Sequence, residues 1–206
     1  MKTCLAAAAA LALLAGCRPP PAAETAEYKP EEAGTVDHAM CLLGFTAVPL
    51  RELATGHHLV DAVLNGRSGT FVLDTGANVS VVHAPLAAEF GLPEKGAAGG
   101  AFGLGGAMKA RQVKLESLRI GAVPIREKRI MVSDLSQIGQ VLGPLSGRTI
   151  GGIIGQDVMK EHRAVIDVSA PILYLMAEDR DPAPVAPERC TAKQPETKGK
   201  AKSAAR

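Results

Sequence analysis

Short apolar runs alternate with glycine-rich or polar turns through the middle of the chain, a pattern typical of a β-rich domain. Residues 57–65 predict one strand, and residues 67–73 predict a second strand that returns beside it. The Asn65-Gly66 pair between them is a strong signal for a type I′ hairpin turn. Residues 71–73 (Phe-Val-Leu) lack polar alternation, so we expect the second strand to be buried on both faces.

The rest of the pattern predicts further strands and a few short helices. A glycine-rich stretch over 96–106 is expected to be the most flexible segment of the domain. The other expected elements are a helix over 85–90 ended by Gly91, a strand pair over 113–120 and 123–132 with a turn at 121–122, a helix over 134–142, and a closing hairpin of strands 163–168 and 172–176.

The start of the chain has the pattern of an export signal over residues 1–16. Lys2 precedes an apolar stretch of about eleven residues, which is too short to span a bilayer. Cys17 follows Leu-Ala-Gly, which resembles a bacterial lipoprotein signal and implies a lipid-modified Cys17 at the mature N-terminus. The expected location is therefore a membrane, the outer one in preference because Arg18 follows the cysteine, facing the periplasm. An ordinary cleaved signal with an incidental cysteine is the alternative.

Composition divides the remaining chain into a folded domain between two tails. Residues 17–35 are expected to form a flexible tether and residues 178–206 a disordered tail, since neither has apolar periodicity. Residues 36–177 are enough for one domain with its own core. The net charge of +2 and the lack of a basic helix or aromatic platform argue against nucleic-acid binding.

The buried strand over 71–73 leads a carboxylate, Asp74, into a tight Asp74-Thr75-Gly76 turn. An unpaired carboxylate is costly to bury, so such a group shifts its pKa or gains partners. For the triplet alone, the alternative is a strand-ending turn in which the aspartate only bonds nearby backbone.

The surrounding residues make the motif more specific. Residues 74–80 (Asp-Thr-Gly-Ala-Asn-Val-Ser) resemble the Asp-Thr-Gly-Ala-x-x-Ser/Thr active-site loop of the retropepsin-like aspartic proteases. Ile153-Ile154-Gly155 resembles that family's second signature, in which two apolar residues and a glycine lie on a strand beside the catalytic loop. The resemblance implies a mainly β fold, a single-lobe retropepsin-like closed β-barrel with one or two short helices.

The same resemblance implies an aspartic endopeptidase, in which paired carboxylates activate a water against a peptide bond. The chain has one Asp-Ser/Thr-Gly motif, so the second carboxylate would be the Asp74 of a second subunit in a homodimer. Thr75 would then hydrogen-bond across the two-fold axis, and Gly76 would place backbone N–H groups against the carboxylates. No cofactor is expected.

The glycine-rich stretch over 96–106 resembles, by its position, the flap that closes over substrate in this family, although a long loop is the alternative. A peptide or protein substrate would bind beneath it as an extended strand. Asp157 is expected to N-cap the helix after the second signature rather than to act in catalysis. The residues implied in substrate binding are Ala77, Asn78, Gly99, Gly100, Phe102, Ile153, Ile154 and Gly155.

The remaining cysteines and histidines leave alternatives open. Cys41 and Cys190 flank the domain and are expected either to form a disulfide in an oxidising compartment or to remain two thiols. Neighbouring His57 and His58 would point to opposite faces of a strand, so no metal site is expected.

Two alternatives concern function. The chain would keep the fold without turnover if it were a membrane-tethered lipoprotein that binds peptides or acts as a scaffold. Residues 31–53 would instead cover the cleft until removed if the protein were made as a zymogen.

Overall fold

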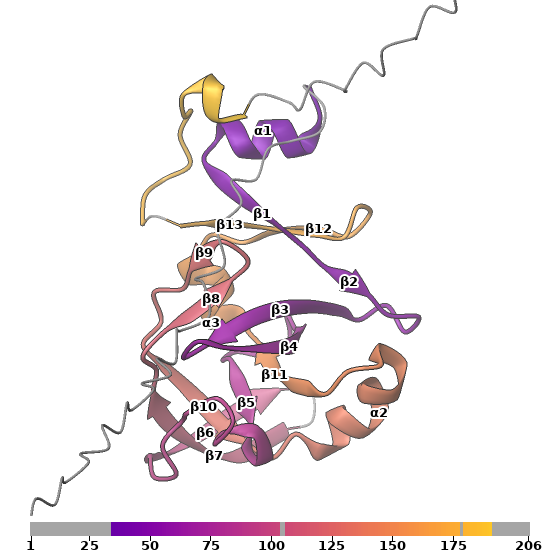
Figure 1. Cartoon of the computed structure of the whole chain (residues 1–206), viewed down its shortest axis with the longest axis vertical. Helices are drawn as coiled ribbons and strands as arrows, with labels where there is room; N and C mark the ends of the chain where they lie inside the picture. The colour runs from indigo at the N-terminus through magenta and orange to yellow at the C-terminus, as the bar shows by residue number, and fades with distance from the viewer. Residues whose placement is uncertain (1–33, 104–105, 178, 191–206) are drawn as a thin grey trace, which may run out of the picture.

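The computed structural model of the chain describes residues 34–103, 106–177 and 179–190. The predicted signal, the predicted lipid site Cys17 and most of the predicted tether lie outside the described residues. The described chain is mainly β, with two sheets and three α-helices (Figure 1). No helix of these residues is long and apolar enough to cross a membrane.

The larger sheet has ten strands in the order β6-β7-β10-β5-β11-β4-β3-β8-β9, with β2 paired to β3. Among the described residues this order is an open path from β6 to β9, so the mainly β prediction is confirmed without a closed ring of paired strands. The strands are β2 (Arg51–Glu52), β3 (His58–Leu64), β4 (Arg67–Leu73), β5 (Val81–His83), β6 (Ala97–Gly103), β7 (Gly106–Lys114), β8 (Leu118–Ile120), β9 (Val123–Pro124), β10 (Arg129–Ser133) and β11 (Ile150–Ile154).

The hairpin of β3 and β4 forms as the sequence predicts. Asn65 and Gly66 both have positive φ, 46° and 78°, which is the conformation of a type I′ turn. Strand β4 lies between β3 and β11, and the side chains of residues 71–73 are all buried. Strand β11 runs parallel to β4 and antiparallel to β5, so the second signature lies directly beside the strand that ends at Asp74.

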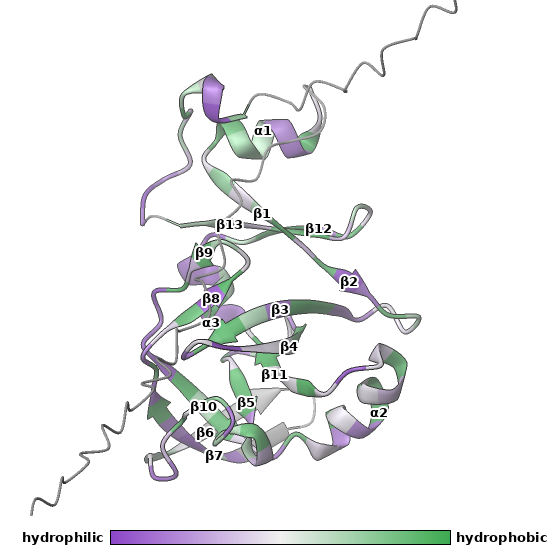
Figure 2. Cartoon of the chain, viewed as in Figure 1, coloured by the Kyte–Doolittle hydropathy of each residue, from purple (hydrophilic) through white to green (hydrophobic). Residues whose placement is uncertain are grey.

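The central strands bury a different set of apolar side chains on each face. One face contributes Phe71, Leu73 and Ile154 to the largest hydrophobic cluster, which we call the core cluster. The other face contributes Val72 and Ile153 to a second cluster. Figure 2 shows hydrophobic residues concentrated along these strands and hydrophilic ones on β2. The second cluster consists of Leu53, Leu59, Val72, Ala77, Val81, Met131, Leu135, Leu142, Ile150 and Ile153.

The smaller sheet joins the two ends of the domain in the order β1-β13-β12. Its strands are β1 (Phe45–Pro49), β12 (Val165–Asp167) and β13 (Ile172–Met176), and the pair β12–β13 is the closing hairpin that the sequence predicts. Helix α1 (Val36–Leu42) covers one face of this sheet, where the Tyr174 hydroxyl donates a hydrogen bond to Asp37 at 3.1 Å. The other face packs on the core cluster.

The described part of residues 31–53, the segment suggested as a removable cover, is part of the fold. Within residues 34–53, β1 pairs with β13 over five residues and β2 pairs with β3. Removing this segment would expose the apolar faces of the smaller sheet, so the described structure does not have the arrangement of a zymogen.

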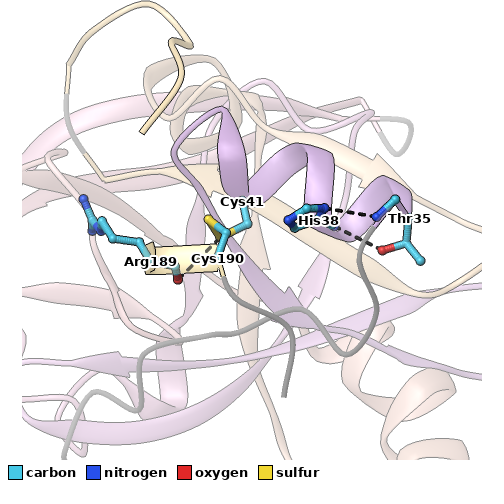
Figure 3. Close-up of a disulfide and its surroundings, with 6 residues drawn as sticks. Thr35, His38, Cys41, Arg189 and Cys190 are labelled. Atoms are coloured by element: carbon cyan, nitrogen blue, oxygen red, sulfur yellow. Dashed lines mark hydrogen bonds between the residues drawn. A yellow bond between two sulfur atoms is a disulfide. The ribbon is translucent and has the colours of Figure 1, made fainter. Parts of the chain in front are cut away.

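Residues 179–190 are attached to helix α1, in contrast to the disordered tail predicted from residue 178. The backbone N–H groups of Ala183 and Val185 bond to the carbonyls of Leu43 and Leu42, at 3.3 Å and 2.8 Å. Cys41 and Cys190 form a disulfide (Figure 3). This covalent link and the backbone bonds order a segment whose composition lacks apolar periodicity.

Of the other predicted elements, the helix expected over 85–90 is replaced by a short 3₁₀ turn, and the strand expected over 123–132 divides into β9 and β10. The strand expected over 113–120 divides at a turn into β7 and β8, and the helix expected over 134–142 is α2 (Ser136–Ser146). Residues 84–86 form a 3₁₀ turn, and Gly91 ends the turns that follow with φ of 66°. Helix α3 (Gln156–Glu161) follows β11 directly.

Candidate active site

Asp74 lies at the end of β4 in a turn that leaves its carboxylate half-buried. Its backbone N–H bonds to the Ile154 carbonyl at 3.0 Å, and its carboxylate oxygen Oδ1 accepts the Gly76 N–H at 2.8 Å. Within the described chain, the other oxygen, Oδ2, accepts no hydrogen bond. Thr75 and Gly76 are exposed. The turn therefore fixes one oxygen of the carboxylate and leaves the other for a reaction partner.

The second signature holds this turn from behind. A Cβ atom at Gly155 would lie 2.6 Å from the backbone carbon and oxygen of Val79, so only glycine fits at this close approach. Gln156 then makes two bonds to the turn, from its backbone N–H to the Ala77 carbonyl at 2.8 Å and from Nε2 to the Thr75 carbonyl at 2.6 Å. Gln156 is a site residue that the sequence did not single out, although it directly follows the second signature.

Asp157 has a different role from the predicted N-cap. The residue that caps α3 is Gly155, and Asp157 is in the first turn of the helix. Its Oδ1 accepts the Ser80 hydroxyl at 2.7 Å, and its Oδ2 accepts the Ser80 backbone N–H at 2.8 Å. Ser80 is the last residue of the catalytic-loop motif, so Asp157 joins the two signatures.

The two isoleucines of the second signature point to opposite faces, because side chains alternate along a strand. Ile153 belongs to the second cluster with Val72 and Ala77, which flank Asp74 in sequence. Ile154 is fully buried in the core cluster. The structure thus places Ile153 next to the catalytic turn, and it corrects the prediction that the Ile154 side chain binds substrate.

The glycine-rich stretch forms an antiparallel hairpin of β6 and β7, which replaces the alternative of a long loop. A Cβ atom at Gly99 would lie 2.5 Å from the Met131 methyl carbon, so β6 packs closely on the second cluster. Gly100 and Phe102 lie in β6 by their backbone pairing, and the side chain of Phe102 is outside the described part of the structure. The hairpin and the catalytic turn therefore meet at the same cluster.

Comparisons with known proteins agree with this geometry. Residues 60–158, which include both signatures and the hairpin, match the profile of the aspartyl protease family. The match spans just under half of the chain, and this part is similar to the aspartyl protease family. A search of curated proteins found no match.

Among solved structures, the chain is similar to a retropepsin-like aspartic protease from Rickettsia conorii. The identity is 20%, the match covers 64% of this chain and 88% of that one, and the TM-score is 0.43. It is also similar to the EIAV protease complexed with the inhibitor HBY-793. Here the identity is 19%, the match covers 50% of this chain and 84% of that one, and the TM-score is 0.38.

The described residues contain one Asp-Thr-Gly turn. Among its described residues, no group of three His, Cys, Asp or Glu side chains is placed to hold a metal ion. Asn78 is exposed beside the turn and Ala77 is buried beneath it. The arrangement is one carboxylate with a free oxygen, an apolar surface beside it, and a hairpin over that surface.

Proposed function

We propose that the protein is an aspartic endopeptidase that acts as a homodimer, with one Asp74 from each subunit. The observation that carries this proposal is the incomplete site. The Asp-Thr-Gly turn is rigidly held by Ile154, Gly155 and Gln156, yet Thr75 and Gly76 are exposed where a second turn would contact them. A two-fold axis beside Thr75 completes the pair.

In such a pair, two carboxylates at short distance share one proton, because like charges this close disfavour double ionisation. The ionised carboxylate accepts a proton from water as the water oxygen attacks the peptide carbonyl. The protonated carboxyl donates its proton to the carbonyl oxygen. As the tetrahedral intermediate breaks down, the carboxyl that took the proton from water gives it to the departing amine. The other carboxylate accepts the proton of an intermediate hydroxyl as the new carbonyl forms, so the pair again shares one proton. Gly76 supports this chemistry by holding Oδ1, so that Oδ2 faces the water.

The tip of the β12–β13 hairpin is a suitable contact for the second subunit. A path of backbone pairs leads from this tip to the strand that ends at Asp74. The Leu50 N–H bonds to the Pro171 carbonyl, and the next strand, β2, pairs with β3. In β3, His58 lies opposite Leu73 of β4. Val168, at this tip, is 64% exposed. In the proposed dimer this side chain would be buried between the two subunits.

We also propose that the protein is exported and anchored through a lipid on Cys17. The disulfide between Cys41 and Cys190 supports an oxidising compartment. A lipid on Cys17 would let the residues before Gly34 act as a tether. Mass spectrometry of the membrane fraction, compared with a Cys17→Ala variant, tests this point.

The test of the enzymatic proposal is peptide cleavage by soluble protein that starts after Cys17. Wild type would be compared with Asp74→Asn across about pH 3 to 7, with sedimentation measured on the same samples. We expect cleavage by the wild-type dimer, inhibition by a pepstatin-type inhibitor, and no cleavage by Asp74→Asn.

The matched control is Asp181→Asn, since the Asp181 side chain is 87% exposed and pairs with Arg163 away from the turn. This variant should keep wild-type activity. A folded wild type that cleaves no peptide, or an Asp74→Asn variant that stays active, contradicts the proposal.

A further inference from the structure

A hollow of about 730 Å³ lies between helix α2 and the ends of β5 and β11. His83 and Ile150 form part of its inner wall. Ile150 belongs to the second cluster, and His83 shares a strand face with Val81 of that cluster. The hollow is thus on the same face of the sheet as Val72 and Ile153, and it is an open depression of the surface rather than an enclosed cavity.

Helix α2 forms the outer wall and is attached at both sides of the hollow. Leu142 anchors it in the second cluster, and the Arg51 guanidinium donates to the Ser146 carbonyl at 3.2 Å. The helix turns glycines, Gly139 and Gly143, toward the hollow. An ideal Cβ atom at Gly139 meets no atom within 4 Å, so a larger side chain has room at this position.

Several side chains that line the hollow can donate hydrogen bonds, beside the mixed donor and acceptor groups of Ser136 and Gln140. His83 Nδ1 accepts the Leu135 N–H at 3.0 Å, so in the neutral ring the proton is on Nε2 and can be donated. Arg148 uses one nitrogen to bond Asp61 and keeps further N–H groups, and the Thr149 hydroxyl is at the exposed side. No Asp or Glu is among the residues that line the hollow.

One carboxylate is nearby at the edge. Asp134 lies 3.8 Å from His83 Nδ1, but its Oδ1 accepts the backbone N–H and the hydroxyl of Ser136. These bonds lower the pKa of the Asp134 carboxyl. Both bonds direct Oδ1 toward Ser136 at the start of α2, and Asp134 is not among the residues that line the hollow.

We propose that this hollow is a substrate subsite that selects an acidic or carboxamide side chain of an extended peptide. The proposal rests on the endopeptidase function above. The hollow begins at Ile150, four positions before Ile154, whose carbonyl bonds to Asp74. At about 3.3 Å per residue this is roughly 13 Å, so the selected side chain is about four residues from the scissile bond.

The experiment compares two leucine substitutions on the same helix. Gly139→Leu places a large side chain in the hollow and also favours the helix, because glycine is a poor helix former. The variant is therefore expected to fold. Val141→Leu is the matched control, since Val141 is 63% exposed and does not line the hollow.

Peptide libraries with each position varied would be cleaved by wild type and both variants. We expect wild type and Val141→Leu to prefer Asp, Glu, Asn or Gln over Ala at one position three to five residues from the scissile bond. Gly139→Leu should reduce that ratio of kcat/KM values at least tenfold. The subsite is overturned if wild type cleaves peptides with Asp, Glu, Asn or Gln at that position with the same kcat/KM as peptides with Ala. It is also overturned if Gly139→Leu keeps the wild-type preference. Absence of any cleavage dependent on Asp74 in wild type overturns the endopeptidase function instead, so the two failures are distinct.

Discussion

Ser80 and Asp157 share two hydrogen bonds, one from the hydroxyl at 2.7 Å and one from the backbone N–H at 2.8 Å. The Ser80 oxygen also accepts the buried Gly155 N–H at 2.9 Å. One serine therefore connects the catalytic loop, the second signature and helix α3. Because these bonds lie behind the Asp-Thr-Gly turn, the position of Asp74 depends on them.

Removing the Ser80 hydroxyl should destabilise the domain and weaken catalysis together. Ser80→Ala leaves the Gly155 N–H and the Asp157 carboxylate without this partner, and a buried unsatisfied group costs about 1–3 kcal/mol. Urea unfolding should show a loss of that size, with a lower kcat. Ser80→Thr keeps the hydroxyl and should stay close to wild type. Equal stability of wild type and Ser80→Ala would show that the pair is not needed.

A methyl group at Gly155 should displace the catalytic loop. In Gly155→Ala the new carbon meets the Val79 backbone at 2.6 Å, and backbone cannot rotate away as a side chain can. Overpacking of this kind costs about 1–3 kcal/mol or more. The melting temperature and the rate of peptide cleavage should both fall. Gly139→Ala, where a Cβ meets no atom within 4 Å, is the control for stability and should be neutral or stabilising.

The domain should lose stability as the pH falls below the unfolded pKa of histidine because of His162. This side chain is fully buried, its Nδ1 lies 2.7 Å from the Met176 carbonyl, and its Nε2 accepts the Arg126 N–H at 3.0 Å. Burial, and less strongly the charge of Arg126, lowers the pKa of His162 below 6.5, against the opposing effects of Met176, Glu161 and Asp179. The folded state therefore keeps the ring neutral, while the unfolded state gains a proton.

The sign of this effect gives the measurement. Stability from His162 is present above about pH 6.5 and falls below it, by at most about 1.4 kcal/mol per pH unit for one proton. Urea unfolding at pH 7, 6 and 5 should show this slope in wild type. The same series on His162→Gln should have a smaller slope between pH 6.5 and 5, whatever its absolute stability. Identical slopes would assign the pH dependence to other groups.

The disulfide should stabilise the protein through a long closed loop. Cys41 and Cys190 are 149 positions apart, so the link removes much chain entropy from the unfolded state. A Cys41→Ser, Cys190→Ser double variant should lose about 2–4 kcal/mol in urea unfolding. Limited proteolysis should then cleave within residues 179–190 first. Without the covalent link, the backbone attachment of that segment to α1 is reduced to the bonds from Ala183 and Val185. A cleavage pattern like that of wild type would argue against a role for the link.

A charge at the tip of the β12–β13 hairpin should weaken the proposed dimer without unfolding the subunit. Val168→Asp changes an exposed side chain, so the monomer should keep its melting temperature. Sedimentation should show a dissociation constant at least tenfold higher, and activity per subunit should recover at high protein concentration. Val36→Asp on α1, where the side chain is 61% exposed, is the control and should not change dimerisation. Unchanged dimerisation in Val168→Asp would place the contact elsewhere.

Local patterns predicted the parts of the fold that local interactions determine. Asn65-Gly66 adopts the backbone of a type I′ turn without help from distant residues, and the apolar run over 71–73 is buried as expected. Distant contacts decided the rest. The strand expected over 113–120 is interrupted because the Asn65 side-chain oxygen accepts the N–H groups of Glu116 and Ser117.

The candidate site was predicted to a similar extent. The two signatures were recognisable from spacing and meet in the structure. The predicted roles of Asp157 and Ile154 were wrong in detail. An aspartate that caps a helix and one that bonds a distant serine look alike in sequence. Which face of the sheet the Ile154 side chain points to depends on the neighbouring strands. The order of residues 179–190 depends on pairing between Cys41 and Cys190, which sequence alone left open.

The pairing of β1 with β13 also decides when the domain can be completed. Phe45 lies opposite Met176, so the strand that opens the domain has no partner until the strand that closes it has been synthesised. Contacts between distant parts of a chain form slowly, because a long loop must close first. A nascent chain on the ribosome therefore carries the complete Asp-Thr-Gly motif while the smaller sheet is still missing, and assembly of the finished domain is delayed until translation has passed residue 176.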